Sequence, residues 1–145
     1  MHDLPRKLTV AELAALFEGR TRFVERLADR ENPLGEARAL LAGLSEDEQL
    51  EALNAHPRIG AGRASPTSAR EQGGDADPAV LSELARLNQA YEARFGFRFV
   101  VFVNGRPRAA ILHVLRARIR RPRAQELRAG LDDLVSIALN RYRSR

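Results

Sequence analysis

Residues 95–103, with the sequence FGFRFVVFV, form the one strand-like run in this chain of 145 residues. Aromatic and β-branched residues favour extended backbone, and Asn104-Gly105 directly after them is typical of a hairpin turn. No second run of this kind follows to pair with it, and helical apolar spacing lies on both sides. We therefore expect an all-α fold, a single-domain helical bundle over residues 1–145 with one extended segment, about 95–103, packed among the helices.

Helix-start signals divide the rest of the chain. Thr9–Glu12 and Ser45–Glu48 each have the spacing of a capping box in front of an apolar stripe. Asp77-Pro78 has the sequence of an N-cap and a first helical residue. Further helical patterns cover Ala109–Ile119 and the stretch that Pro122 opens. The N-terminal third is thus expected to form short amphipathic helices, and the last third two longer ones.

A long irregular stretch follows His56-Pro57. Proline disfavours helical backbone at the preceding residue, so the helix before it should end at His56. Residues 58–77 then contain four glycines and Pro66. A connection of this length in a compact domain is usually functional or mobile. His56 therefore lies at the start of a candidate functional loop.

Composition limits the function classes. Hydrophobic residues make up 44% of the chain, which is enough for a core and excludes disorder as the main state. No apolar run reaches the roughly 18 residues of a membrane span, and the first residues lack the apolar region of a secretory signal. Cysteine is absent, which excludes disulfides and thiolate chemistry and fits a reducing compartment. We expect a cytoplasmic protein with no membrane partner.

The charge balance is basic, with 24 Lys and Arg against 19 Asp and Glu and a sequence pI near 10.8. Codon usage in a GC-rich genome explains an arginine excess; an anionic partner is the alternative. Five arginines gather around a predicted helix break: Arg116, Arg118, Arg120, Arg121 and Arg123. We interpret them as a solvated surface, with a nucleic-acid groove as the alternative.

Two places in the chain could carry chemistry. His56 lies at a helix end fixed by Pro57, whereas His113 lies beside a helical apolar stripe and is expected to be a partly exposed structural residue. Ser68 and Glu71 have capping-box spacing, so Glu71 either caps a short helix or presents a carboxylate beside Gln72. Together His56 and Glu71 offer a proton donor and acceptor. No spacing of ligand residues suggests a metal site.

Several segments occur in a fixed order along the chain: His56–Gly60, Ser68–Gln72, Leu87–Tyr91, Arg94–Val101, Glu126-Leu127 and Ile137–Arg141. This ordered series resembles the family of decarboxylases that act on 2-oxo-4-hydroxy-4-carboxy-5-ureidoimidazoline (OHCU) in uric acid degradation. The resemblance extends from about Leu8 to Arg143 and is strongest over 56–103.

The resemblance implies an all-α fold, no metal, no organic cofactor, a ureidoimidazoline as substrate, and often a homodimer. It implies decarboxylation of OHCU to (S)-allantoin, with His56 as the catalytic acid and Glu71 as an essential carboxylate. By the same resemblance, the substrate-binding residues are Pro57, Ser68, Ala69, Arg70, Gln72, Phe99, Val100, Val101, Phe102, Val103 and Arg141. The family often has proline where Arg98 stands, so the approach of that segment is expected to differ.

Two other functions remain as alternatives. An arginine-rich helical module that binds nucleic acid would need basic residues interleaved with aromatics or helix-turn-helix spacing, and neither pattern is present. A relative that binds a ligand but has lost catalysis is disfavoured by the presence of His56 and Glu71. A frayed arginine is the alternative interpretation of Arg141.

Overall fold

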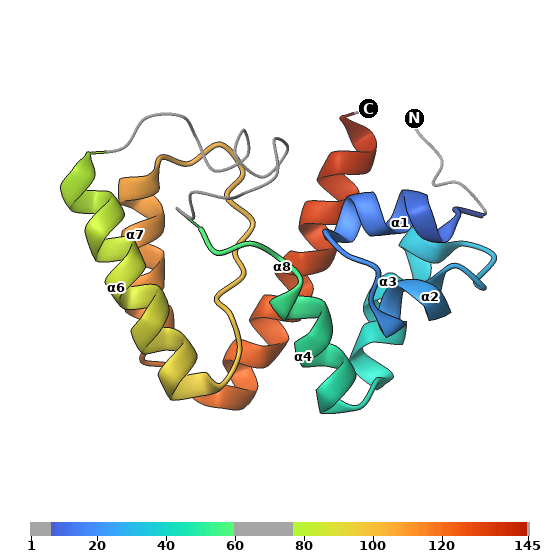
Figure 1. Ribbon diagram of the computed structural model, residues 1–145, viewed down its shortest axis with the longest axis horizontal. Coiled ribbons are helices and arrows are strands. Elements are labelled where there is room, and N and C mark those ends of the chain that lie inside the picture. Colours follow the sequence, from blue (N-terminus) through green and yellow to red (C-terminus); the bar gives the residue numbers. More distant parts are fainter. Residues whose placement is uncertain (1–6, 60–76, 145) are drawn as a thin grey trace.

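The computed structural model describes residues 7–59 and 77–144. Within these ranges the chain forms seven helices and no strand, which confirms the all-α fold (Figure 1). The helices are α1 (Val10–Phe17), α2 (Arg22–Leu27), α3 (Pro33–Gly43), α4 (Glu46–Asn54), α6 (Pro78–Phe95), α7 (Arg108–Arg118) and α8 (Arg123–Arg143). Every helix in these ranges is too short or too polar to cross a bilayer.

The helix starts follow the predicted caps. The Thr9 hydroxyl accepts a hydrogen bond from the Glu12 amide, and the Glu12 carboxylate accepts one from the Thr9 amide, so the capping box is complete. Ser45 accepts from the Glu48 amide at 3.3 Å, and Asp77 from the Ala79 amide at 2.8 Å. Each cap satisfies an amide that has no partner inside its helix.

Helix α8 is the central element of the fold. It packs against α1, α3 and α4, whereas α6 and α7 pack on each other at the other end of the molecule (Figure 1). A Cβ at Gly130 of α8 would lie 3.3 Å from Leu53 Cδ2, so this glycine allows α4 to approach closely. The end of α4, where His56 follows, is held against α8 in this way.

The extended segment connects the end of α6 to the start of α7, and it runs beside α8 and α4 (Figure 1). Its start was predicted two residues too early, because Phe95 is the last residue of α6 and Gly96, with φ of 82°, ends that helix in the left-handed conformation. Phe97 and Phe99 are buried against the Tyr91 ring, with centroid distances of 5.9 and 5.2 Å.

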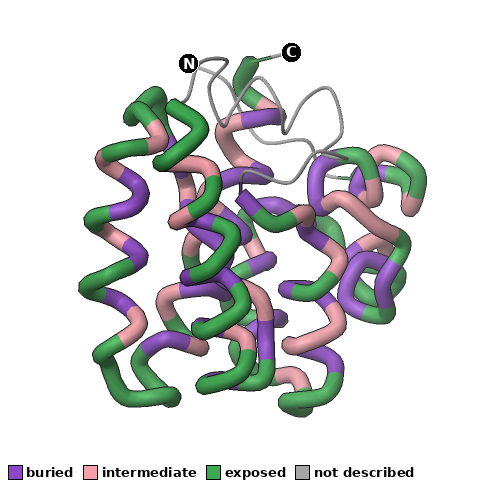
Figure 2. The backbone as a smooth tube through the Cα atoms, turned by 60° about the vertical axis from the view of Figure 1, so that its left-hand side comes forward, coloured by how far each residue is buried: buried purple, intermediate pink, exposed green. Residues whose placement is uncertain are grey.

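The turn after the segment was predicted correctly, but it joins no strands. Asn104 and Gly105 have φ of 50° and 76°, and the Arg106 amide donates to the Val103 carbonyl at 3.1 Å. The chain enters α7 instead of a partner strand. Along the helices, buried and exposed stretches alternate from turn to turn, as expected for amphipathic helices around one core (Figure 2).

Candidate active site

His56 follows the C-terminal end of α4. The helix ends at Asn54, and the His56 amide makes a short-turn hydrogen bond to the Leu53 carbonyl at 3.1 Å. The helix was expected to run up to His56 and ends two residues earlier, at Asn54, while Pro57 disfavours helical backbone at His56. The turn places the His56 side chain in the interior, where the residue is only 7% exposed. His113, in contrast, is exposed on α7.

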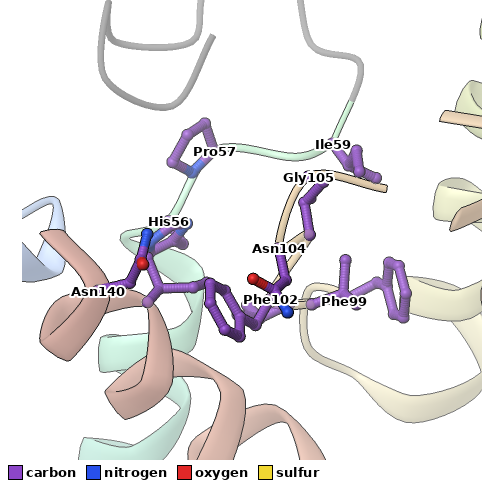
Figure 3. A pocket seen from close by; sticks show the side chains of 12 residues that line it. His56, Pro57, Ile59, Phe99, Phe102, Asn104, Gly105 and Asn140 are labelled. Carbon is purple, nitrogen blue, oxygen red and sulfur yellow. The ribbon is translucent and has the colours of Figure 1, made fainter. Parts of the chain in front are cut away.

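A cavity of about 100 Å³ lies in front of His56. Its wall combines the turn after α4, the extended segment and the C-terminal half of α8. The lining residues are His56, Pro57, Ile59, Phe99, Val100, Val101, Phe102, Val103, Asn104, Gly105, Ile137 and Asn140. His56 and Asn140 are drawn on one side of this cavity, with Ile59 and Phe99 on the other (Figure 3).

The structure brings seven of the predicted site residues to this cavity: His56, Pro57 and all of 99–103. Five others, Ser68, Ala69, Arg70, Glu71 and Gln72, lie outside the described residues. The sequence did not single out Asn140, Ile137, Asn104 or Ile59 as site residues. The sequence contained a signal for Ile137 and Asn140. Residues three apart on a helix share a face, and both residues come shortly before the predicted site residue Arg141.

Side chains, not a partner strand, hold the backbone of the extended segment. The Arg98 amide donates to Asn54 Oδ1 at 3.0 Å, and the Phe102 amide donates to Asp133 Oδ2 at 3.0 Å. The Val100 carbonyl accepts from Arg118 Nη1 at 3.3 Å. These residues alternate along the segment, so their backbone groups point to the helices. Backbone groups of successive residues point in opposite directions in an extended chain, so we expect those of Phe99 and Val101 to point away from these helices.

A buried ionic cluster lies behind this wall. Arg118 Nε lies 2.8 Å from Glu126 Oε1, and the Tyr91 hydroxyl donates to the same oxygen at 2.7 Å. The Arg118 guanidinium also lies over the Phe99 ring, 4.8 Å from its centroid. Burial, with the Glu126 hydrogen bond, raises the pKa of Tyr91, and burial raises that of Asp133, 3.5 Å from Arg118. These groups rigidly connect α6, α7 and α8 to the cavity wall.

This cluster corrects the interpretation of the arginines around 116–123 as a solvated surface for Arg118 alone, since Arg116, Arg120, Arg121 and Arg123 are exposed as expected. Arg118 is 5% exposed because Glu126, with no exposure at all, requires a cationic partner. Arg123 pairs with Glu46 at 2.8 Å and Arg116 with Glu83 at 3.5 Å. The sequence signal was available: Arg118 lies on the same helical face as Leu115 and Ile111, at spacings of three and seven.

The surroundings of His56 favour the neutral imidazole. Burial, then the positive charge of Arg141, lowers the pKa of His56 to about 4, while Glu18 acts in the opposite direction. His56 Nε2 is buried and has no hydrogen-bond partner within the described residues. A buried nitrogen without a partner that borders a cavity can bond a ligand group placed there.

Arg141 is buried beside this region and does not line the cavity. It is 6% exposed, which excludes a frayed arginine. Its Nη1 donates to the Leu16 carbonyl at 3.1 Å, and its Nη2 lies 3.0 Å from Glu18 Oε1. Arg141 is therefore near enough to influence His56, but its guanidinium is already engaged by the end of α1. Among the described residues, no group of His, Asp and Glu has the arrangement of a metal site.

A model of the OHCU decarboxylase family matches residues 2–143. The chain belongs to the OHCU decarboxylase family. It is 31% identical over 99 residues to the 2-oxo-4-hydroxy-4-carboxy-5-ureidoimidazoline decarboxylase of Haloferax volcanii, covering 65% of this chain and 59% of that one. It is 31% identical over 104 residues to the bifunctional uric acid degradation protein of Bacillus subtilis, covering 68% of this chain and 21% of that one.

The fold agrees with this membership. A crystal structure of an OHCU decarboxylase in the presence of (S)-allantoin superimposes with a TM-score of 0.76 and 25% identity, over 90% of this chain and 94% of that one. The match to the two curated relatives spans less than two thirds of the length of either. Family and fold are thus shown for this chain.

Proposed function

We propose that this chain is a carboxy-lyase that decarboxylates OHCU to (S)-allantoin, without a metal or an organic cofactor. The observation that carries the proposal is the shared position of His56 and residues 99–103 at one cavity of a chain that matches the family over residues 2–143. The catalysed step belongs to urate degradation, which is also where the named relatives act.

The substrate itself supplies the electron sink. When the bond from the ring carbon to the carboxylate breaks, its electron pair forms a ring C=C bond, and the C=N pair moves to nitrogen. The ring nitrogen takes a proton, the resulting enol takes a second proton on the neighbouring carbon, and its hydroxyl releases a proton as it becomes a carbonyl. One proton is consumed overall, and a single positioned acid decides which face receives it.

His56 is the acid in this proposal, although its pKa of about 4 leaves it neutral in the free protein. The substrate carboxylate resolves this conflict, because a negative charge beside a buried imidazole raises its pKa and draws a proton onto it. Once CO2 has left, the imidazolium has lost its anionic neighbour and becomes a stronger acid. Proton delivery thus follows decarboxylation.

Other predicted residues complete the proposal. Phe99 and Val101 present backbone groups that can bond the ring amides and carbonyls, and Pro57 borders the same cavity. Glu71 orients the hydroxyl or ureido groups, and Ser68, Ala69, Arg70 and Gln72 bind the same molecule, as the family resemblance implies. Arg141 supplies positive charge for the substrate anion. A homodimer and a cytoplasmic location remain predictions. Light scattering, which measures the molar mass in solution, tests the homodimer.

A coupled assay in a single cuvette tests the reaction. Urate is converted by urate oxidase and hydroxyisourate hydrolase, the chain is added, and circular dichroism follows (S)-allantoin. OHCU decays unaided to racemic allantoin, so the chain should raise both the rate and the excess of the S form. Unchanged rate and a racemic product would refute the proposal and leave a relative that only binds the molecule. A salt titration distinguishes this proposal from the nucleic-acid alternative. The affinity for nucleic acid falls steeply with salt, whereas turnover of a small anion should fall only mildly.

A further inference from the structure

Arg98 holds both ends of the turn that carries His56. Its backbone amide donates to Asn54 Oδ1 at 3.0 Å, and its guanidinium Nη1 donates to the His56 carbonyl at 2.9 Å. Asn54 is the last residue of α4, so one residue of the extended segment closes a ring across the turn. A cation at the carbonyl end of a helix is also favoured by the helix dipole.

The chain beyond Pro57 has anchors of its own. Arg58 makes a two-bond ion pair with Glu92 at 2.6 and 2.9 Å, and the Ile59 carbonyl accepts from Asn88 Nδ2 at 3.1 Å. Both anchors fix the segment to α6. Within the described residues, Arg98 is therefore the side chain that bonds to the backbone of His56 itself.

The Nε2 atom of the His56 imidazole is buried and has no hydrogen-bond partner within the described residues. Its position therefore depends on the backbone of the turn and on packing. A hydrogen bond to the His56 carbonyl holds the plane of the His56–Pro57 peptide group and so restricts ψ of His56, one of the two backbone angles beside the Cα that carries the imidazole. Small displacements of a catalytic group reduce rate strongly, so this bond acts on chemistry more than on folding.

We propose that Arg98 is a positioning residue for the reaction, which fixes the His56 turn against the extended segment so that the imidazole faces the cavity. This inference rests on the proposed function. Arg98 belongs to a surface hollow lined by Asn54, Arg58, Glu92, Gly96, Phe97 and Arg98, which shares no lining residue with the cavity. It therefore acts through His56 and does not contact the substrate.

The test compares Arg98→Met, Arg98→Lys and a matched control, Arg94→Met. Arg94 also donates from its guanidinium to a backbone carbonyl, that of Arg121 at 3.4 Å, which is not a cavity residue. We expect Arg98→Met to lower kcat about tenfold or more with little change in KM, to reduce the excess of (S)-allantoin, and to keep a wild-type melting temperature. Arg98→Lys should recover part of kcat, and Arg94→Met should match wild type.

The His56 ring signal in the NMR spectrum, assigned with His56→Asn, provides a readout that does not need turnover. Arg98→Met should shift and broaden this signal, whereas Arg94→Met should leave it in place. Unchanged kcat and an unchanged His56 signal in Arg98→Met would overturn the inference. Equal losses in Arg94→Met would overturn it as well. If wild type itself fails to turn over OHCU, the proposed function fails, and the ring signal still decides whether Arg98 positions His56.

Discussion

The guanidinium of Arg141 and the carboxylate of Glu18 form an ion pair, with 3.0 Å between Nη2 and Oε1, where α8 passes the end of α1. Both charges act on His56, since Arg141 lowers its pKa and Glu18 raises it. A substrate anion would therefore enter a site where a cation is present and partly balanced.

Truncation of Arg141 should affect both binding and stability. Arg141→Ala removes the partner of Glu18, and breaking a buried pair costs roughly 3–5 kcal/mol. It should also lower kcat/KM, because the positive charge that Arg141 holds near the cavity is lost. Arg141→Lys keeps the positive charge but loses the planar guanidinium fork. Its stability and kcat/KM should lie between those of wild type and Arg141→Ala. Arg143→Ala, at an exposed position on the same helix, is the control. Wild-type kinetics in all variants would place Arg141 outside the site.

Acid should destabilise the protein through His56. Its pKa is about 4 in the folded state and about 6.5 in an unfolded chain, so between these values the unfolded state binds more protons. The free energy of unfolding should therefore fall as pH drops from about 6.5 to about 4, by about 3 kcal/mol in total. Urea titrations at pH 7 and pH 4.5 measure this fall. His56→Asn should show a smaller fall, and equal falls would contradict the low pKa.

The Arg118–Glu126 pair should respond differently to single and double substitution. Arg118→Met leaves Glu126 as a buried charge without its 2.8 Å partner and should cost roughly 3–5 kcal/mol. Adding Glu126→Leu removes that charge and should recover much of the loss. Arg120→Met, at an exposed position, should change little. A double variant as unstable as the sum of both single variants would show that the ionic contacts contribute independently.

Local signals in the sequence were sufficient for most of the fold. Thr9, Ser45 and Asp77 were identified as helix caps because their side chains act on amides two or three residues away. Pro57 indicated the end of α4 to within two residues for a similarly local reason. The boundary at Phe95 was missed, because phenylalanine, which favours extended backbone, occurs on both sides of Gly96, and only the φ of Gly96 decides where the helix ends.

The site was predictable to a smaller extent. His56 and residues 99–103 could be linked only through the family resemblance, because nothing local shows that the two stretches meet. The Arg118 cluster was missed although Arg118 shares a helical face with Leu115 and Ile111, because arginine is so frequent in this chain that this one position was not separated from the exposed ones. Asn140 joins the cavity through the packing of α8, which depends on contacts far apart in the sequence.

Glu71→Gln separates two interpretations of a residue outside the described ranges. If Glu71 supplies the carboxylate that orients the substrate, this variant should lose activity and melt within a few degrees of wild type. If Glu71 only caps a helix, the variant should remain active and lose roughly 0.5–2 kcal/mol of stability. Kinetics and a thermal melt on the same sample distinguish the two outcomes.

The central claim is that His56 delivers the proton that completes OHCU decarboxylation, and the rate of (S)-allantoin formation by His56→Asn tests it most directly. General acid catalysis contributes roughly 10²–10⁴-fold, so this variant should lose that much turnover while its far-UV spectrum and melting curve show a folded protein. His113→Asn, changed at an exposed histidine, should keep the wild-type rate. A wild-type rate in His56→Asn, with the same excess of (S)-allantoin, would contradict the claim.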